Sequence, residues 1–438
     1  MSLRERMRAR AVGQGHPIRV GLVGAGQMGA GLMSQMERMD GMRVVAVADA
    51  IPGRASAAYG EASVAPEIVV SLEDDPRRAG ELIDAGQRIA AVQAEWLVHI
   101  PNLDVIVECT GIPEVGARVS IGAIEAGKHI VNMNVETDAT IGYVLAQKAL
   151  QAKVVYTLAA GDEPGTIKEI YDFADALGFE IVAIGKGKNN PLDRTANPDT
   201  VARRAKEQNM SAKMLASFVD GTKTMVEMTS IANGTGFRPE VPGGYGPQCS
   251  SKDLAKVFVP KADGGIFDAR GAVDYAVGDV APGVFVIITT DQPKIMADLR
   301  YLRLNGHGRY WALYRPYHLA NLETPITVAR AVLDGEVTLA TYDQPTAETV
   351  AVAKRDLQPG ERIDALGGFT VYGLIERALV ARSETMLPLG LAIGATLLKP
   401  VKAGQPLRYA DVELNEKQTI LRLRQEQDRL LSGGDASR

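Results

Sequence analysis

IRVGLVGAGQMGAGLMSQMERMDGMRVVAVAD is the sequence of residues 18–49, and it decides the fold. Its first six residues, Ile18–Val23, are apolar enough for a buried parallel strand. Residues 44–48 form a second apolar run, which ends at Asp49. Between the two runs, apolar side chains recur mostly every three to four residues, as on one face of a helix: Met28, Leu32, Met33, Met36 and Met39. The stretch therefore predicts a strand, a turn, a helix and a second strand.

The turn that joins the first strand to the helix has the spacing G-x-G-x-x-G, in Gly24, Ala25, Gly26, Gln27, Met28 and Gly29. Asp49 ends the next strand 20 residues beyond Gly29, as the dinucleotide-binding fingerprint requires. Gly24 permits the tight turn, Gly26 lets the backbone approach a pyrophosphate, and Gly29 lets the helix meet the strand. We interpret the turn as a nicotinamide dinucleotide site rather than a purely structural glycine turn.

Asp49 also bears on the choice of cofactor. Its carboxylate can accept both ribose hydroxyls of NAD, whereas it would repel the 2′-phosphate of NADP. We therefore expect NAD to be favoured over NADP, although Arg54 is placed so that it could pair with a phosphate. Thr110 and Gly111 follow the strand at 103–109, where we expect them to line the nicotinamide side; the alternative is that Gly111 only makes a turn.

Composition and charge limit the class of protein. The chain has 438 residues, of which 46% are apolar and 23% charged, so we expect two or three folded domains. Lysine and arginine number 48 against 53 acidic residues, and the net charge of −5 argues against nucleic acid as a partner. No apolar run approaches the roughly 18 residues of a membrane helix. With two cysteines and no secretory signal before Pro17, we expect a cytoplasmic protein without a membrane partner.

Strand and helix patterns alternate up to residue 158, which predicts an α/β fold that begins with a Rossmann domain, a doubly wound parallel sheet. Within it, residues 53–101 are expected to form helices that cover the sheet, with helical periodicity over 79–94. A homodimer is also expected. The predicted domains are 1–158, to which 323–340 return, an α+β substrate and dimerisation domain at 159–322, a small β module at 345–414, and a helix with a flexible tail at 415–438.

The β module contains an internal repeat. Residues 355–363 (RDLQPGERI) and 399–407 (KPVKAGQPL) share a basic residue, an aliphatic residue, a glycine and a final aliphatic residue at the same spacing. The copies lie 44 residues apart, with Gly360 and Gly404 at matched positions. Two matched strand–turn units predict a small pseudo-symmetric β structure.

Several motifs resemble those of the homoserine dehydrogenase superfamily: residues 108–111 (ECTG), 125–129 (EAGKH) and 161–164 (GDEP). Further motifs are similar to those of the 1-deoxy-D-xylulose 5-phosphate reductoisomerase-like proteins, a branch of that superfamily: residues 185–192 (GKGKNNPL), 223–228 (KTMVEM), 231–233 (IAN) and 315–319 (RPYHL). Residues 348–414 resemble a SAF domain, whose β-clip fold matches the repeat. The resemblance covers nearly the whole chain.

The resemblance implies a reductoisomerase that converts 1-deoxy-D-xylulose 5-phosphate into 2-C-methyl-D-erythritol 4-phosphate, for isoprenoid precursor synthesis. Two positions depart from the pattern. Asp49 stands where a residue that accepts the phosphate of NADPH would be expected, and residues 132–136 (NMNVE) lack the lysine of homoserine dehydrogenases. The alternatives are an NAD-dependent, homoserine dehydrogenase-like enzyme acting on a hydroxy acid, amino-alcohol or sugar acid, and a non-catalytic dinucleotide-sensing regulator.

The candidate catalytic residues fall in two segments. The first is predicted to be a loop after a strand: Lys186, Lys188, Asn189 and Asn190. Lysine there can polarise a carbonyl or bind phosphate, and asparagine can orient hydroxyls; the alternative is a solvated turn. The second lies among aromatic residues: Arg315, Tyr317 and His318. Arginine suits a phosphate or carboxylate, and histidine can transfer a proton near neutral pH, unless it is a structural residue.

Three carboxylates are candidates for holding Mg²⁺ or Mn²⁺: Asp162, Glu163 and Glu227. Asp162 can instead cap the helix that begins near Pro164. Glu227 lies four residues after Lys223 on a predicted helix, so the alternative is a surface ion pair. The expected partner is a small phosphorylated or carboxylated substrate.

Overall fold

The computed structural model describes residues 1–434; the last four residues of the predicted flexible tail, 435–438, lie outside the described part. Within the described residues the chain divides into two compact units. The first comprises Met1–Asp162, Leu319–Tyr342 and the residues from Leu423 onward. The second comprises Glu163–His318 and Asp343–Arg422. The SAF-like residues therefore share a unit with the predicted substrate domain.

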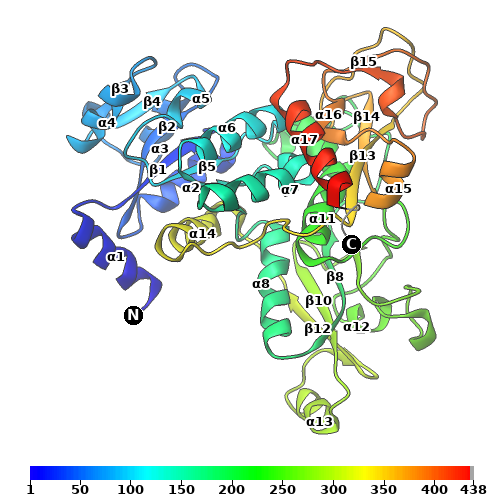
Figure 1. Cartoon of the computed structure of the whole chain (residues 1–438). Helices are drawn as coiled ribbons and strands as arrows, with labels where there is room; N and C mark the ends of the chain where they lie inside the picture. The colour runs from blue at the N-terminus through cyan, green and yellow to red at the C-terminus, as the bar shows by residue number, and fades with distance from the viewer. Residues whose placement is uncertain (435–438) are drawn as a thin grey trace. The chain divides into compact units, whose positions relative to one another are not determined.

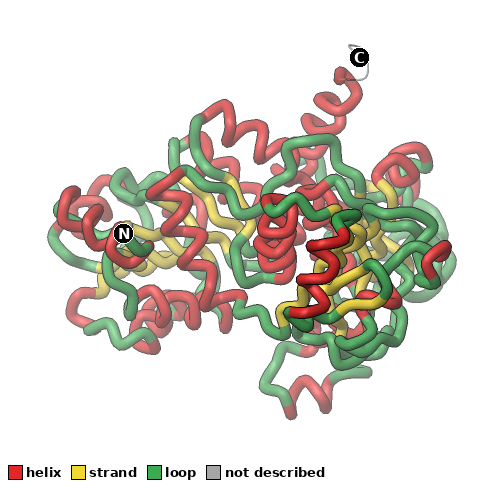
Figure 2. Tube along the Cα trace, turned by 90° about the horizontal axis from the view of Figure 1, so that it is seen from below, coloured by secondary structure: helices red, strands yellow, loops and turns green. Residues whose placement is uncertain are grey.

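The first unit is built on a parallel sheet (Figure 1). Its strands lie in the order β3 (Val69–Ser71), β4 (Arg88–Ala91), β2 (Met42–Ala48), β1 (Ile18–Val23), β5 (Val105–Glu108), β6 (His129–Asn132) and β7 (Tyr156–Leu158). The chain builds outward from β1 in both directions, with β2 on one side and β5 on the other, so β1 and β5 form the switch point of a doubly wound fold. Figure 2 shows helices on both faces of these strands. The predicted Rossmann sheet is confirmed.

The helices of the first unit are α1 (Leu3–Gln14), α2 (Gln27–Met36), α3 (Arg54–Glu61), α4 (Pro76–Asp84), α5 (Ala94–Leu97), α6 (Pro113–Glu125), α7 (Val135–Ala152) and α14 (Ala320–Asp334). Leu32, Met33 and Met36 of α2 are fully buried, as their spacing predicted, whereas Met28 is 43% exposed. α14 packs against α2, where the side chain of Asn321 fills the space that a Cβ on Gly31 would need. The apolar stripe of α2 therefore belongs to the core of this unit.

Residues 53–101 are not all helical, which corrects the prediction. Two short strands lie in this stretch, and β4 occupies part of the range 79–94 that was expected to be helical. Ile89 and Ala90 are buried in β4, which pairs in parallel with both β2 and β3. Four residues are too few to display a period, so contacts with neighbouring strands decide their conformation.

The second unit contains a mixed sheet in the order β11 (Gly306–His307), β12 (Tyr310–Arg315), β10 (Val284–Thr289), β8 (Glu180–Lys188) and β9 (Ala272–Val277). β8 pairs antiparallel with β10 and parallel with β9, so it is flanked on both edges. The helices of this part are α8 (Glu163–Ala176), α9 (Ala202–Glu207), α10 (Ala212–Val219), α11 (Thr222–Thr235), α12 (Leu254–Val257) and α13 (Pro293–Tyr301). α8 packs against both β8 and α11.

The SAF-like module completes the second unit. Its elements are β13 (Ala347–Ala353), β14 (Val371–Arg377), α15 (Ala378–Ser383), α16 (Leu389–Ala392), β15 (Thr396–Leu397) and β16 (Val412–Glu413). The two repeats pair with each other: Leu357 and Val401, at matched positions, exchange backbone hydrogen bonds of 2.8 and 3.1 Å. Gly360 donates its N–H to Leu397 at 2.7 Å, and Gly404 donates its N–H to Ala353 at 2.8 Å; each acceptor lies two residues before the other repeat begins. The predicted pseudo-symmetric β structure is confirmed.

The last helix, α17 (Thr419–Gly434), begins in the second unit and ends in the first. In the first unit it lies along α7. Gln427 accepts the N–H of Val144 at 3.1 Å, and Arg424 donates to the carbonyl of Thr140 at 3.3 Å. None of the helices within residues 1–434 has the length and apolar character to cross a membrane.

Candidate active site

The glycine-rich turn between β1 and α2 has the geometry that dinucleotide binding needs. Gly24 has a φ of +94°, and a Cβ there would lie 3.1 Å from the backbone nitrogen of Thr110. A Cβ on Gly29 would overlap the carbonyl oxygen of Gly24, so α2 can begin this close to β1 only with glycine. A Cβ on Gly26 would meet no atom within 4 Å, so glycine here keeps the start of α2 open. These residues fit the pyrophosphate of a dinucleotide.

Asp49 follows β2 and is tied to the glycine-rich turn. Its Oδ2 accepts the N–H of Ala25, and its Oδ1 accepts the N–H of Ile51, both at 2.9 Å. Arg54 lies 3.6 Å from Oδ1, and 43% of its side chain is exposed. Each carboxylate oxygen has a further lone pair, so Asp49 can still accept a ribose hydroxyl. The bond to Ala25, which the sequence did not predict, gives Asp49 a second role in shaping the turn.

Glu108 is a buried acid at the end of β5 that the sequence analysis did not single out. Its Oε1 accepts the backbone N–H of Thr110 at 2.8 Å and also the Thr110 hydroxyl. Complete burial raises the pKa of Glu108 to about 7, against the effect of these bonds. Gly111, with a φ of +67°, makes the turn that follows. A charged residue ending an otherwise apolar strand is the signal that could have identified Glu108.

Lys186 and Lys188 lie within β8 and not in a loop after it, which corrects the prediction. Because they are two residues apart in a strand, their side chains share one face. Both are buried, at 6% and 4% exposure. Gly185 and Gly187 alternate with them, and a Cβ on either would overlap the backbone of a neighbouring segment. Gly185 and Gly187 are therefore needed for close packing within the sheet, although glycine is also common in loops.

The ammonium group of Lys186 lies between two carboxylates. Its Nζ donates to Glu163 Oε1 at 2.5 Å and to Glu227 Oε2. Burial alone lowers the pKa of Lys186, but Glu163 and Glu227 outweigh burial and raise it above its ordinary value. Lys186 is therefore a fixed cation near neutral pH. The alternative of a surface pair for Glu227 is wrong, because Glu227 is only 3% exposed and binds Lys186.

Lys188 has the opposite electrostatic surroundings. Its Nζ donates to the backbone carbonyl of Phe218 at 2.7 Å, which is a neutral acceptor. Burial, followed by repulsion from the charge of Lys186, lowers the pKa of Lys188 to about 8. This amine can therefore gain and lose a proton close to neutral pH, which suits a general acid or base.

Asn189 and Asn190 follow β8 and differ in exposure. Asn190 is 4% exposed, and its amide donates to Asn189 Oδ1 at 2.9 Å, whereas Asn189 is exposed. Arg204 of α9 donates to Asn190 Oδ1 and is among the charges that lower the pKa of Lys188. Arg204 could not be identified from the sequence, because its contact joins positions 14 residues apart and no local pattern links them.

The structure brings His318 to the Lys186 cluster, by which we mean Lys186, Glu163 and Glu227. His318 Nε2 lies 3.4 Å from Glu163 Oε1, and its side chain is 21% exposed. Arg315, at the end of β12, pairs with Glu169 at 3.3 Å and stacks 4.5 Å over the ring of Tyr317. Tyr317 is 50% exposed.

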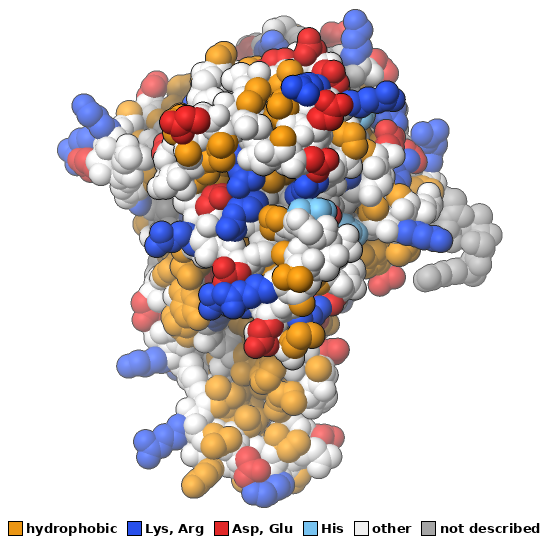
Figure 3. Space-filling view, turned by 90° about the vertical axis from the view of Figure 1, so that its left-hand side faces the viewer, with side chains coloured by type: hydrophobic (Ala, Val, Ile, Leu, Met, Phe, Trp, Pro, Cys, Tyr) orange, Lys and Arg blue, Asp and Glu red, His pale blue; other side chains and the backbone are white. Residues whose placement is uncertain are grey.

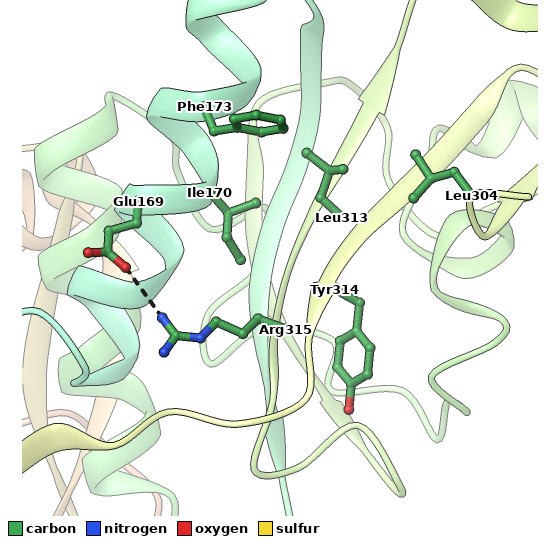
Figure 4. Close-up of a pocket in the computed structure, with 7 residues that line it drawn as sticks. All are labelled: Glu169, Ile170, Phe173, Leu304, Leu313, Tyr314 and Arg315. Atoms are coloured by element: carbon green, nitrogen blue, oxygen red, sulfur yellow. Dashed lines mark hydrogen bonds and ion pairs between the residues drawn. The ribbon is translucent and has the colours of Figure 1, made fainter. Parts of the chain in front are cut away.

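A shallow hollow of about 360 Å³ lies beside Arg315. Figure 4 shows Phe173 and Leu313 on its walls, with the Arg315–Glu169 ion pair at one end. Apolar side chains gather low in Figure 3, at the height of α8 and β12 in Figure 1. The hollow has a mainly apolar lining and one ion pair, so it lacks the convergent polar groups of a catalytic site.

Two of the three residues predicted to bind a metal, Glu163 and Glu227, are bound to a lysine. Glu163 and Glu227 both hold the Lys186 ammonium group, which takes the place that a divalent cation would occupy between them. A second cation there would be repelled by Lys186. Asp162 ends the first segment of the first unit and precedes Glu163 in the chain. The pair Glu163 and Glu227 therefore does not fit Mg²⁺ or Mn²⁺ in this arrangement.

Family models match three parts of the chain. Residues 24–158 match the NAD-binding domain of homoserine dehydrogenase, residues 161–324 match the catalytic domain of the oxidoreductase DRL, and residues 348–413 match the SAF domain. The first and third matches confirm the predicted homoserine dehydrogenase-like cofactor domain and SAF domain. No curated protein matches the sequence.

The solved structures to which the chain is similar include the following three, all below 20% identity. A probable dehydrogenase from Thermotoga maritima is 13% identical, with a TM-score of 0.41 over 73% of this chain and 90% of that one. The scyllo-inositol dehydrogenase of Lactobacillus casei, solved with NAD(H) and scyllo-inositol, is 14% identical, with a TM-score of 0.36. The match covers 62% of this chain and 73% of that one. The 1-deoxy-D-xylulose 5-phosphate reductoisomerase of Zymomonas mobilis, solved with NADPH, is 19% identical, with a TM-score of 0.34. The match covers 48% of this chain and 57% of that one.

The cofactor turn and the family matches agree. The G-x-G-x-x-G turn lies in the segment matched by an NAD-binding domain, and the two buried lysines lie in the segment matched by an oxidoreductase catalytic domain. This pairing argues against a regulator that binds the dinucleotide without turnover. The chain is an NAD(P)-dependent oxidoreductase that carries a homoserine dehydrogenase-type NAD-binding domain, an oxidoreductase catalytic domain and a SAF domain.

Proposed function

We propose that the protein is an NAD-dependent dehydrogenase that oxidises a hydroxyl carbon of a small hydroxy acid, amino-alcohol or sugar acid. The observation that supports this most is the pair of buried lysines on one face of β8. Lys186 is held as a cation, whereas the pKa of Lys188 is lowered to about 8. Oxidation of an alcohol needs a base that takes the hydroxyl proton, and a positive group that holds the substrate oxygen assists it.

The roles of these residues follow from their partners. A bound nicotinamide supplies the acceptor for the hydride that leaves the carbinol carbon. Lys188, in its neutral form, accepts the hydroxyl proton as the carbonyl forms. Lys186 has three N–H donors, and two of them meet Glu163 and Glu227, so the third is available to the substrate oxygen. His318 lies beside this cluster, with its Nε2 3.4 Å from Glu163 Oε1 and its side chain partly exposed.

The preference for NAD rests on Asp49. Replacing Asp49 with serine removes the carboxylate that would repel a 2′-phosphate and releases Arg54 to bind it. We expect the ratio of kcat/KM for NAD⁺ to that for NADP⁺ to fall by about tenfold or more. Asp49→Asn is the matched control, since it keeps an oxygen for the N–H of Ala25 while removing the charge. An unchanged ratio in both variants would show that Asp49 does not face the ribose.

The assay that tests the proposal follows the cofactor. Purified full-length protein is mixed with NAD⁺ or NADP⁺ and a panel of hydroxy acids, homoserine and sugar acids, and reduced cofactor is measured with EDTA or with Mn²⁺. We expect NADH to form with a member of the panel, and the Lys188→Met variant to lose this activity. If no compound in the panel reduces either cofactor, the proposal is contradicted.

Reductoisomerisation of 1-deoxy-D-xylulose 5-phosphate is the second candidate. It is favoured by the resemblance of residues 185–192 to the reductoisomerase-like proteins, since these residues include both buried lysines. The same protein sample is therefore given NADH or NADPH together with this phosphosugar and Mn²⁺. Oxidation of the cofactor here, without NADH formation from the panel, would replace the leading proposal by this one.

A further inference from the structure

Helix α11 is held along its length by the SAF-like module. Thr222 accepts the N–H of Gly373 at 2.9 Å, and the hydroxyl groups of Thr229 and Thr349 lie 2.7 Å apart. Asn233, near the carboxyl end of the helix, accepts two backbone N–H groups of the module at 2.9 Å. Positions 222, 229 and 233 fall on one face of a helix.

The opposite side of α11 carries the acid that binds Lys186. At about 100° per residue, Glu227 lies about 140° around the helix from Thr222. Its carboxylate reaches Lys186 Nζ. One helix therefore joins the SAF-like module to the Lys186 cluster.

Lys354, the residue directly after β13, is a charged residue of the SAF-like module that contacts the catalytic part of the same unit. Its side chain is 3% exposed, and its Nζ pairs with the fully buried Asp220 at 2.8 Å. The same nitrogen donates to the carbonyl groups of Ala196 and Gly368, at 2.5 and 2.7 Å. Lys354 therefore contacts both ends of the segment 196–220, through a hydrogen bond to Ala196 and an ion pair with Asp220.

The Phe218–Asp220 turn contacts both Lys354 and Lys188. Asp220 accepts the N–H of Thr222 at 2.8 Å at the start of α11, and Phe218, two residues earlier, accepts from Lys188 Nζ at 2.7 Å. The charged groups that act on Lys188 come from three elements and the turn: Lys186 of β8, Glu227 of α11, Arg204 of α9, and Asp220.

We propose that the SAF domain is a built-in part of the active site, and that Lys354 is a positioning residue. By pairing with Asp220, it fixes the Phe218–Asp220 turn and compensates the carboxylate charge beside the proton-transfer group Lys188. The inference rests on the proposed function for the role of Lys188. The SAF domain would then act on the catalytic residues of the second unit, to which it belongs.

The test compares four proteins: wild type, Lys354→Met, Asp220→Asn and the double variant. The pKa of Lys188 is measured without substrate, from the pH dependence of its acetylation by acetic anhydride, followed by mass spectrometry. Lys354→Met leaves the Asp220 carboxylate uncompensated, so we expect the pKa of Lys188 to rise; Asp220→Asn should lower it. The expected shifts are about half to one unit, and the double variant should return toward wild type.

Lys402→Met is the matched control, because Lys402 is a module lysine whose side chain is 71% exposed and pairs with Asp356 on the surface. It should leave the pKa of Lys188 unchanged. The same pKa in all variants would overturn the inference. Shifts of opposite sign in the two single variants would support it even if no substrate is turned over, which would count against the proposed function alone. If Lys354→Met does not fold, Asp220→Asn and the double variant still give the comparison.

Discussion

Two lysines that lie two residues apart in β8 differ in charge behaviour because their partners differ. Lys186 meets two carboxylates and keeps its proton, whereas Lys188 meets a backbone carbonyl and has its pKa lowered to about 8. The sequence identified both residues as catalytic candidates from the motif GKGKNN. It could not distinguish their roles, because Glu163, Glu227 and Phe218 come from distant positions in the chain.

The pH dependence of the reaction should report Lys188. Oxidation needs the neutral amine, so we expect kcat/KM for NAD⁺ reduction to rise with pH and to level off above about 8. Lys188→Met should lower kcat by about 100-fold or more and abolish this limb. A variant that keeps the same pH limb would show that another group takes the proton.

Glu108 should make the protein less stable as pH rises. Its pKa is about 7 in the folded state against an ordinary value of 4.5, so the folded state binds the proton more tightly. Stability is then lost between pH 4.5 and 7 and stays lower above pH 7. We expect Glu108→Gln to be more stable than wild type at pH 8, by on the order of 1 to 3 kcal/mol, and equal to it at pH 4.

Urea unfolding at several pH values measures this effect. Glu125→Gln on the exposed surface of α6 is the control, and it should leave the pH dependence unchanged. Parallel stability curves for wild type and Glu108→Gln would show that Glu108 does not hold a proton in the folded state.

At the scale of elements, predictions succeeded where a local pattern is strong. The strand, turn and helix of residues 18–36 are confirmed because burial and the 3.6-residue period both mark them. The predictions for the residues of β4 and for the end of β8 were wrong, because the conformation of these residues depends on pairing with distant strands. Four residues with mixed composition in β4, and alternating glycine and lysine in β8, carry no decisive local signal.

The glycine-rich turn allows cofactor binding to be separated from folding. Gly29→Ala should destabilise the protein by about 1 to 3 kcal/mol, because its Cβ would overlap the carbonyl oxygen of Gly24. Gly26→Ala should leave stability unchanged, because its Cβ meets no atom within 4 Å, but should weaken NADH binding by about tenfold or more.

Thermal unfolding and NADH titration of these two variants make the comparison. Equal NADH affinity in wild type and Gly26→Ala would mean that the pyrophosphate does not approach this glycine.

At the scale of the whole molecule, the sequence predicted the kinds of domain better than their connections. The Rossmann sheet and the repeat each follow from a repeated or periodic pattern, and the SAF domain was predicted from its resemblance to that family. The ion pair of Lys354 with Asp220 joins residues 134 positions apart, and no local pattern marks it. The homodimer and the identity of the substrate stay predictions, because both depend on surfaces and partners outside a single chain.

We expect oxidation of one substrate by NAD⁺ to require both the glycine-rich turn (Gly24 to Gly29) and Lys188. The most direct test measures NADH formation by wild type, Gly26→Ala, Lys188→Met and the surface control Lys402→Met at pH 8, with the best compound of the panel. We predict full activity in Lys402→Met, recovery of Gly26→Ala only at high NAD⁺ concentration, and no recovery of Lys188→Met under any condition. Wild-type turnover by Lys188→Met would contradict the account.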